Sequence, residues 1–190
     1  KIENYYQKNT LNEWIGLLEK VEKSEKYKAV VIRIDSPGGT PGASQELYNS
    51  ILRIKKTGKK VIISMGDVCA SGGYYIASAG DLILANPSTL TGSIGVIMSY
   101  PVIEKLEKTL GVDMVTIKSN QHKDIGSMHR VPTIEEKEIF KGIIKDTYSQ
   151  FVKDISKGRK MSEEEMYKLA DGRIYTGNSA LKNGLVDKLG

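Results

Sequence analysis

The sequence has one cysteine, two histidines and no long apolar run. A single cysteine, Cys69, excludes an internal disulfide framework and a four-cysteine zinc site in this chain of 190 residues. A helix that crosses a bilayer needs about 20 consecutive apolar residues, and no run approaches that length. No cluster of His, Cys and Asp residues has the spacing of metal ligands. The sequence therefore predicts neither a bound metal nor any other cofactor.

Charge and hydrophobic content are those of an ordinary globular protein. Hydrophobic residues make up 39% of the chain and charged residues 27%, and 28 basic against 23 acidic side chains give a net charge of +5. No platform of aromatic and basic residues accompanies this charge, so we expect no nucleic-acid partner. The chain starts without methionine and stops at Gly190. We therefore expect a fragment of a longer protein, with a signal or membrane anchor upstream.

Strand and helix patterns alternate through the first 118 residues. Apolar and β-branched runs predict strands at 28–34, which we expect to be buried, and at 61–65, 82–85, 93–98 and 112–117. Helical spacing and end signals predict helices after the capping box Thr10–Glu13, over 43–57, after Ser71 and over 102–110. Such alternation is typical of parallel βαβ units.

The remainder of the chain is predicted to be helical. A polar loop at 119–131 comes first. A capping box at 133–136 then begins a long helix that ends near Lys157, and a second box at 162–165 begins another helix. No repeat or low-complexity linker interrupts the sequence. We expect one α/β domain over residues 1–190, with a helical C-terminal part.

Two glycine-rich turns follow predicted strands, DSPGG at 35–39 and ASGG at 70–73. Functional sites of open α/β sheets form at the carboxyl ends of strands, where backbone N–H groups of Gly38 and Gly72 could form an oxyanion hole. Alternatively, the glycines only meet the steric needs of tight connections. The DSPGG turn lacks the Lys-Ser/Thr pair of a P-loop. Nor does Ser71 have a G-x-S-x-G pattern, because Cys69 occupies the first glycine position.

If Ser71 is a nucleophile, another residue must accept its proton. One option is His122 or His129, with Asp124 or Asp67 as the group that orients the imidazole. The other option is Lys123, whose ordinary pKa of about 10.4 would have to be lowered by burial against apolar surface. Composition does not decide between histidine and lysine.

Five ordered sequence blocks give the chain a family resemblance. It resembles the bacterial signal peptide peptidases of the Ser-Lys type, the protease IV family, in their single-domain form. The blocks are IRIDSPGG at 32–39, ASGGYYIA at 70–77, LTGSIGVI at 90–97, IKSNQHKDIGS at 117–127 and ADGRIYTGNSALKNGLVDKLG at 170–190.

The resemblance implies a ClpP/crotonase-like spiral of ββα units and assigns a role to each site residue. Ser71 would be the nucleophile and Lys123 the general base. Ser93 would hydrogen-bond the lysine and hold it in its neutral form. Gly38 and Gly72 would supply the oxyanion N–H groups, and the two histidines would become bystanders.

The activity that the resemblance implies is that of a membrane-associated serine endopeptidase. It would degrade hydrophobic peptides, chiefly cleaved signal peptides, through an acyl-enzyme. The full-length protein would be held at the cell membrane by a single-pass anchor. A ring-like homo-oligomer would bring Ser71 of one subunit to Lys123 of its neighbour.

Some roles stay open at this point. Val68, Ile94, Val96 and Ile97 could line side-chain pockets or belong to the core, and Cys69 is expected to point into the core as a small hydrophobe. The alternatives to a signal peptide peptidase are a crotonase-type acyl-CoA enzyme, a serine protease of similar fold that works beside stomatin-like proteins, and a scaffold without catalysis.

Overall fold

The computed structural model describes residues 11–190, which divide into two compact units. Unit 1 contains residues 11–95 and 150–190, and unit 2 contains Val96–Ser149. Thr10 of the first predicted capping box lies outside the described residues. The prediction of a single peptidase domain over 1–190 stays a prediction.

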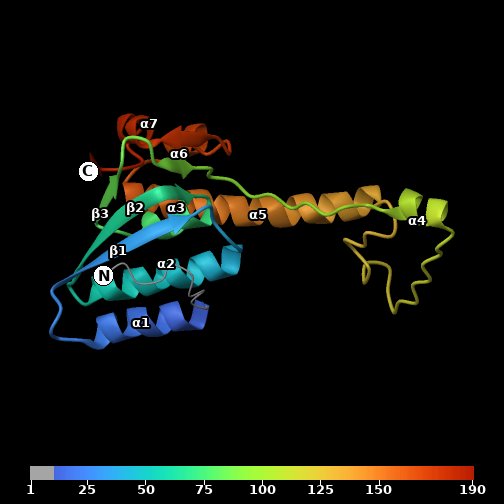
Figure 1. Cartoon of the computed structure of the whole chain (residues 1–190), viewed down its shortest axis with the longest axis horizontal. Coiled ribbons are helices and arrows are strands. Elements are labelled where there is room, and N and C mark those ends of the chain that lie inside the picture. The colour runs from blue at the N-terminus through green and yellow to red at the C-terminus, as the bar shows by residue number, and fades with distance from the viewer. Residues whose placement is uncertain (1–10) are drawn as a thin grey trace. The chain divides into compact units, whose positions relative to one another are not determined.

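Figure 1 labels the helices and the first three strands of the chain. In chain order the elements are α1 (Leu11–Lys23), β1 (Ala29–Ser36), α2 (Pro41–Lys56), β2 (Lys60–Ala70), α3 (Gly72–Ala77), β3 (Leu82–Ala85), β4 (Leu90–Gly92), α4 (Glu104–Leu110), α5 (Ile134–Arg159), α6 (Glu163–Leu169), β5 (Ile174–Thr176), α7 (Gly177–Lys182) and β6 (Lys188–Leu189). Unit 2 contains α4 and the first part of α5, and the remaining elements belong to unit 1.

The sheet of unit 1 is built around β2. Strand β1 pairs with one edge of β2, whereas β3 and β4 pair with the other edge, along its first and last parts respectively. These pairings are parallel, as is that of β6 with β3, and only β5 runs antiparallel to its neighbour β4. The predicted parallel βαβ organisation is confirmed. Because neighbouring parallel strands end at the same edge of a sheet, the turns after β1, β2 and β4 come together.

A bulge extends β2 beyond the predicted strand at 61–65. The register between β1 and β2 shifts after Ile34, which leaves additional residues on β2. The carboxylate of Asp35 accepts the N–H of Val68 at 3.0 Å, so a side chain supplies the acceptor that the ladder lacks there. A Cβ on Gly66 would lie 2.5 Å from Cγ of Asp35, which reserves this position for glycine. The strand therefore continues through Ala70 and ends directly before Ser71.

Helices α2, α3 and the last part of α5 share one aromatic cluster in the core. Tyr48 of α2 stacks on Tyr75 of α3 with ring centroids 4.7 Å apart, and Tyr75 meets Phe151 of α5 edge-on at 5.1 Å. The hydroxyl of Tyr75 donates to the buried carboxylate of Asp154 at 2.5 Å. Helix α1 lies beside α2 (Figure 1). The short helix α3, which follows Ser71, is thus fixed from both sides.

Both predicted capping boxes in the C-terminal part are present. Thr133 accepts the N–H of Glu136 and the Glu136 carboxylate accepts the N–H of Thr133, which begins α5. Ser162 and Glu165 exchange the same pair of bonds at the start of α6. The long helix ends at Arg159, close to the predicted end at Lys157.

Two predicted strands are wrong. Residues 93–98 and 112–117 have no regular structure, and Ile97, Val115 and Ile117 are 87%, 82% and 95% exposed. A β-branched run becomes a strand only where a neighbouring strand accepts its backbone hydrogen bonds, and neither run has such a neighbour within 11–190. The helix predicted over 102–110 begins later, at Glu104.

The first strand is also less buried than predicted. Strand β1 pairs with β2 alone, so it lies at an edge of the sheet. Its side chains alternate between the covered and the open face, and Val31 is 64% exposed. An apolar run therefore indicated the strand correctly but overstated its burial. No helix within 11–190 combines the length and the hydropathy that crossing a bilayer requires.

Candidate active site

Ser71 lies in a strained turn between β2 and α3. Its backbone has φ 53° and ψ −123°, a conformation that costs a non-glycine residue about 1–3 kcal/mol and that is common at functional sites. The N–H of Ser71 donates to the carbonyl oxygen of Gly92 at 2.8 Å, and its carbonyl accepts the N–H of Tyr75 at 2.9 Å. Its hydroxyl makes no hydrogen bond within the part of the chain that the structure describes.

This local geometry is that of a nucleophile elbow, in which a strand, a strained serine and a helix follow one another. The sequence lacks the G-x-S-x-G pattern because Cys69 is present, yet the fold forms a comparable turn without it. Cys69 itself is buried in β2, and burial, together with the nearby Asp35 carboxylate, raises the pKa of its thiol to about 12. The prediction that the thiol belongs to the core is confirmed.

The DSPGG turn lies directly against Ser71. A Cβ placed on Gly38, whose φ is +119°, would be 2.9 Å from Cβ of Ser71 and 3.0 Å from the nitrogen of Gly72. The two glycine-rich turns are therefore brought together, and only glycine allows the approach at 38. The N–H of Gly38 donates to Oγ of Ser36 at 3.1 Å. An oxyanion at this position would thus compete with the Ser36 hydroxyl.

Gly72 is the first residue of α3. Its N–H has no intrahelical acceptor, as is usual at a helix start, and it makes no hydrogen bond with another residue of 11–190. A Cβ on Gly72 would lie 2.4 Å from Oγ of the buried Ser44 and 3.1 Å from the nitrogen of Gly39. The N–H of Gly72 is therefore available to a ligand, and its role as an oxyanion donor stays a prediction.

Ser93 follows the strand β4 at the same corner of the sheet. It too has a positive φ, 49°, and its N–H donates to the carbonyl of Arg173 at 2.8 Å. The preceding residue, Gly92, accepts the N–H of Ser71. Unit 1 therefore brings Ser71, Gly38, Gly72 and Ser93 together. The contact that the family resemblance predicts between Ser93 and a lysine stays a prediction.

Lys123 belongs to unit 2, where it lies in a series of tight turns. Its N–H donates to the carbonyl of Asn120 at 3.2 Å, and the carbonyl of His122 next to it accepts the N–H of Ile125 at 3.1 Å. The side chain of Lys123 is exposed, and its Nζ contacts no hydrogen-bonding or acidic partner among the residues described. Its role as the general base stays a prediction.

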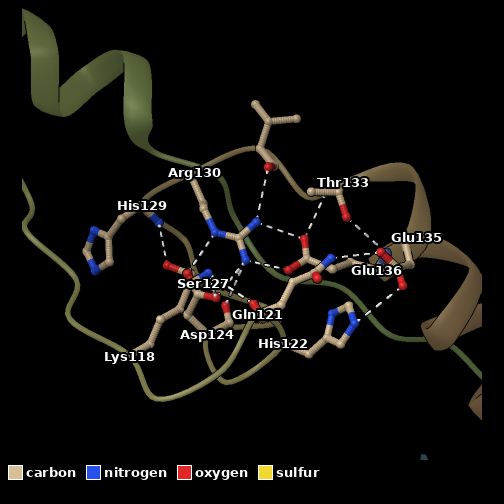
Figure 2. A network of polar contacts seen from close by, with 11 residues as sticks. Lys118, Gln121, His122, Asp124, Ser127, His129, Arg130, Thr133, Glu135 and Glu136 are labelled. Atoms are coloured by element: carbon tan, nitrogen blue, oxygen red, sulfur yellow. Dashed lines mark hydrogen bonds and ion pairs between the residues drawn. The ribbon is translucent and has the colours of Figure 1, made fainter.

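A network of charged side chains holds these turns, as Figure 2 shows. Arg130 donates through Nε and Nη2 to both carboxylate oxygens of Asp124, at 2.8 and 2.9 Å. The same guanidinium donates to both oxygens of Glu136, through Nη1 at 2.8 Å and through Nη2. Lys118 donates to Asp124 at 2.6 Å. The hydrogen bond from Arg130 holds the pKa of Asp124 well below its usual range and, with the Thr133 N–H, lowers that of Glu136 to about 2.

The histidines have partners of their own in unit 2. His129 Nδ1 lies 2.5 Å from the carboxylate of Glu107, and His122 Nε2 lies 3.5 Å from that of Glu135. Asp124, which the Ser-His-Asp alternative used to orient a histidine, instead pairs with Arg130 and Lys118. Asp67, the other candidate orienter, is an exposed residue of β2. The structure therefore does not form the histidine–aspartate pair that Asp124 could have provided.

The four apolar candidates for pocket lining differ in burial. Ile94 is fully buried in unit 1, which makes it a core residue. Val68 is half-buried, as is Val96 of unit 2, and Ile97 of unit 2 is exposed. Only Val68 thus combines a place in unit 1 with partial access to solvent.

Sequence reasoning missed three residues of these two regions. The sequence indicates only a turn at Asp35 and Ser36, whereas their side chains accept the backbone N–H groups of Val68 and Gly38. Arg130 is the third, and no local signal indicates it, because a capping box does not show whether its glutamate is buried against a cation.

Comparison with known proteins places the chain in a family. The model of peptidase family S49 matches residues 53–190, and the model of the Clp protease family matches residues 2–90. The mixed α/β sheet and these matches confirm the ClpP/crotonase-like fold that the resemblance implied.

Three relatives illustrate the similarity. A Synechocystis protein provisionally named a protease is 45% identical over 171 residues, 90% of this chain and 61% of that protein. A protein of Enterococcus faecium provisionally named a signal peptide peptidase is 38% identical over 188 residues, 99% of this chain and 54% of that protein. A chloroplastic serine protease of Arabidopsis thaliana is 40% identical over 177 residues, 93% of this chain and 26% of that protein. The chain spans at most about three fifths of the length of these relatives, and it belongs to peptidase family S49.

Proposed function

We propose that this chain is the catalytic part of a membrane-associated serine endopeptidase that cleaves hydrophobic peptides, chiefly the remnants of cleaved signal peptides. Ser71 is the nucleophile and Lys123 the general base of an acyl-enzyme mechanism. The observation that carries the proposal is the strained conformation of Ser71, beside a Gly38 that has no room for a Cβ. Membership of family S49 and the protease names of its relatives support the same activity.

The turn prepares Ser71 for attack on a peptide carbonyl. Its backbone is held by the bonds to Gly92 and Tyr75, so the hydroxyl projects from a fixed point at the carboxyl end of β2. The oxygen attacks the carbonyl carbon, the carbonyl π electrons move to oxygen, and the resulting oxyanion lies beside the N–H groups of Gly38 and Gly72. One such donor typically lowers the barrier by about 3 kcal/mol.

Lys123 completes the reaction as acid and base. Its neutral amine takes the Ser71 proton during the attack and returns it to the leaving amine, and water then releases the acyl group. Closure of the assembled site around Lys123 excludes water, which disfavours the ammonium form. Ser93, next to the residue that holds the Ser71 backbone, accepts or donates a hydrogen bond that keeps the amine in place.

The assembly that we propose is a ring-like homo-oligomer in which Ser71 of one subunit works with Lys123 of its neighbour. Unit 2 exposes an unusual number of apolar side chains, which an interface between copies would cover. They are Ile97, Met98, Val102, Leu106, Leu110, Val112, Met114, Val115, Ile117, Met128, Val131, Ile134, Ile139 and Ile143. The same apolar character suits hydrophobic peptides as substrates and a site of action close to the membrane.

Active-site labelling tests the chemistry directly. In the assembled protein, a fluorophosphonate should label Ser71, and Ser71→Ala should lose both the label and the hydrolysis of a hydrophobic fluorogenic peptide, by about 10⁴-fold or more. Lys123→Met should lose hydrolysis equally. Lys141→Met, which removes an exposed lysine of the same unit that pairs with Glu138, is the matched control and should retain hydrolysis.

Two results would overturn the proposal. Absence of a Ser71 adduct combined with activity on acyl-CoA thioesters would indicate a crotonase-type enzyme, which needs no serine nucleophile. Cellular function that survives both Ser71→Ala and Lys123→Met would indicate a scaffold without catalysis.

A further inference from the structure

The turns that carry Lys123 have little of their own to hold them. Between Asn120 and Ser127 the backbone makes turn bonds only, among them the N–H of Ser127 to the carbonyl of Asp124 at 3.0 Å. No strand or helix of unit 2 includes Lys123. Side chains hold the turn on both sides of the lysine: Gln121 and His122 contact the exposed carboxylate of Glu135, whereas Asp124 is the more buried anchor, with 12% of its side chain exposed. The position of the Lys123 amine therefore depends chiefly on what holds its neighbour Asp124.

Arg130 provides that anchor. Its planar guanidinium binds two carboxylates at once, each through two oxygens, and one of them belongs to Asp124, which directly follows Lys123. The second carboxylate, that of Glu136, is 2% exposed and also caps the start of α5. Arg130 thus connects the Lys123 turn to the first turn of a 26-residue helix. Lysine could not replace this planar fork, because an ammonium has no bidentate geometry.

Charge balance gives Arg130 a second effect on Lys123. Its neighbour Asp124 carries a carboxylate with only 12% of the side chain exposed, and an uncompensated anion beside an amine favours the ammonium form. Arg130 and Lys118 compensate that anion. The other charged or titratable groups around the turn are His122 and Glu135, which pair with each other, and Glu136, which Arg130 also neutralises.

We infer that Arg130 is a positioning residue for the general base: by clamping Asp124 to Glu136, it fixes the turn that carries Lys123 and compensates the acidic neighbour of that lysine. The inference rests on the proposed function, because it takes Lys123 as the base. In this role Arg130 acts through Asp124 alone.

Two substitutions test this inference: one removes the positive charge of Arg130 and the other removes the negative charge of Asp124. In the assembled protein, Arg130→Met and Asp124→Asn each break the clamp, so each should lower kcat at least about tenfold while KM changes little. In Arg130→Met the acid limb of the pH profile, where kcat/KM rises as Lys123 loses its proton, should move to higher pH. The reason is that this variant leaves an uncompensated anion beside Lys123. The acid limb should move to lower pH in Asp124→Asn, which leaves two cations. Each shift should be about half a pH unit.

Controls separate position from simple loss of structure. Lys141→Met breaks an exposed ion pair in the same unit and should leave both kcat and the pH limb unchanged. Arg130→Lys retains the cation without the fork, so it should keep the wild-type limb but recover little of kcat. If Arg130→Met does not fold, the pair Arg130→Lys and Asp124→Asn carries the same test.

The outcomes distinguish the inference from the proposed function. If Lys123→Met is inactive but both clamp variants retain wild-type kcat and pH limbs, with only a lower melting temperature, then Arg130 is structural and the inference is wrong. The inference is also wrong if the acid limb of kcat/KM moves in the same direction in Arg130→Met and in Asp124→Asn. If Lys123→Met itself retains activity, the proposed base is wrong and the inference falls with it.

Discussion

The nucleophile corner of unit 1 and the lysine turn of unit 2 are built by different forces. Around Ser71 the backbone positions the nucleophile: the turn is strained, Gly38 approaches because it has no Cβ, and the N–H of Ser71 donates to the carbonyl of Gly92. Around Lys123 the turn is held by side-chain charges, those of the Arg130 guanidinium and of the Asp124 and Glu136 carboxylates. The first region should therefore tolerate changes of pH and salt but not one added methyl group. The second should tolerate small steric changes but not the loss of a charge.

The largest effect is expected from adding a methyl group at Gly38. In Gly38→Ala the new Cβ would lie 2.9 Å from Cβ of Ser71, on a backbone with φ +119°, so the DSPGG turn must move away from the nucleophile. Loss of one oxyanion donor alone costs about 10²–10³ in kcat. We expect at least that loss for peptide hydrolysis.

Gly39→Ala is the matched control for this change. A Cβ on Gly39 meets no atom within 4 Å, and its φ is not in the left-handed region. It should retain most of the activity of the wild type. Equal losses in the two variants would mean that the turn, rather than the contact with Ser71, is what the reaction needs.

An intermediate effect is expected when acid titrates the clamp of unit 2. The pKa of Glu136 is lowered from 4.5 to about 2, first by the hydrogen bond from Arg130 and then by the N–H of Thr133. A depressed folded pKa stabilises the protein above the unfolded pKa, and this contribution is lost as pH falls from about 4.5 towards 2. Glu136→Gln should therefore melt several degrees below the wild type at pH 6, with the gap closing below pH 4.

Melting curves at several pH values measure this difference. Glu138→Gln, which removes an exposed carboxylate two residues along the same helix, should show almost no gap at any pH. A gap that persists unchanged at pH 2 would mean that Glu136 stabilises the helix start as a neutral hydrogen-bonding group.

The smallest effect is expected from the histidines. Each one pairs with a glutamate of unit 2, and Asp124 does not orient either of them. His122→Asn combined with His129→Asn should leave the acid limb of kcat/KM in place and change its plateau by no more than about twofold. Loss of hydrolysis in a folded double variant would instead restore a histidine as the base and remove Lys123 from that role.

Local signals in the sequence predicted most of unit 1. The capping box at 162–165 and the apolar runs of β1, β2 and β3 specify structure through neighbouring residues, so they could be found without coordinates. The runs at 93–98 and 112–117 also contain β-branched residues but have no partner strand among the described residues, and a local sequence pattern does not show whether a partner exists.

The site residues also differ in whether local sequence could predict their place. The place of the two glycine-rich turns after parallel strands indicated a shared site as one of two possibilities, and the structure does bring Gly38 against Ser71. The strained backbone of Ser71 could not be predicted, because it depends on the bond from its N–H to Gly92. Arg130 could not be found by motif either, since its partners lie six residues away on both sides, Asp124 in a loop and Glu136 in the first turn of α5, with no repeating period that joins them.

The chain's one thiol gives the nucleophile strand an internal reporter. Cys69 lies two residues before Ser71, fully buried, and its raised pKa of about 12 leaves almost no reactive thiolate near neutral pH. Alkylating reagents therefore reach it only after β2 has separated from its neighbours. The rate at which the native protein loses its thiol measures how often that strand opens, without any introduced label.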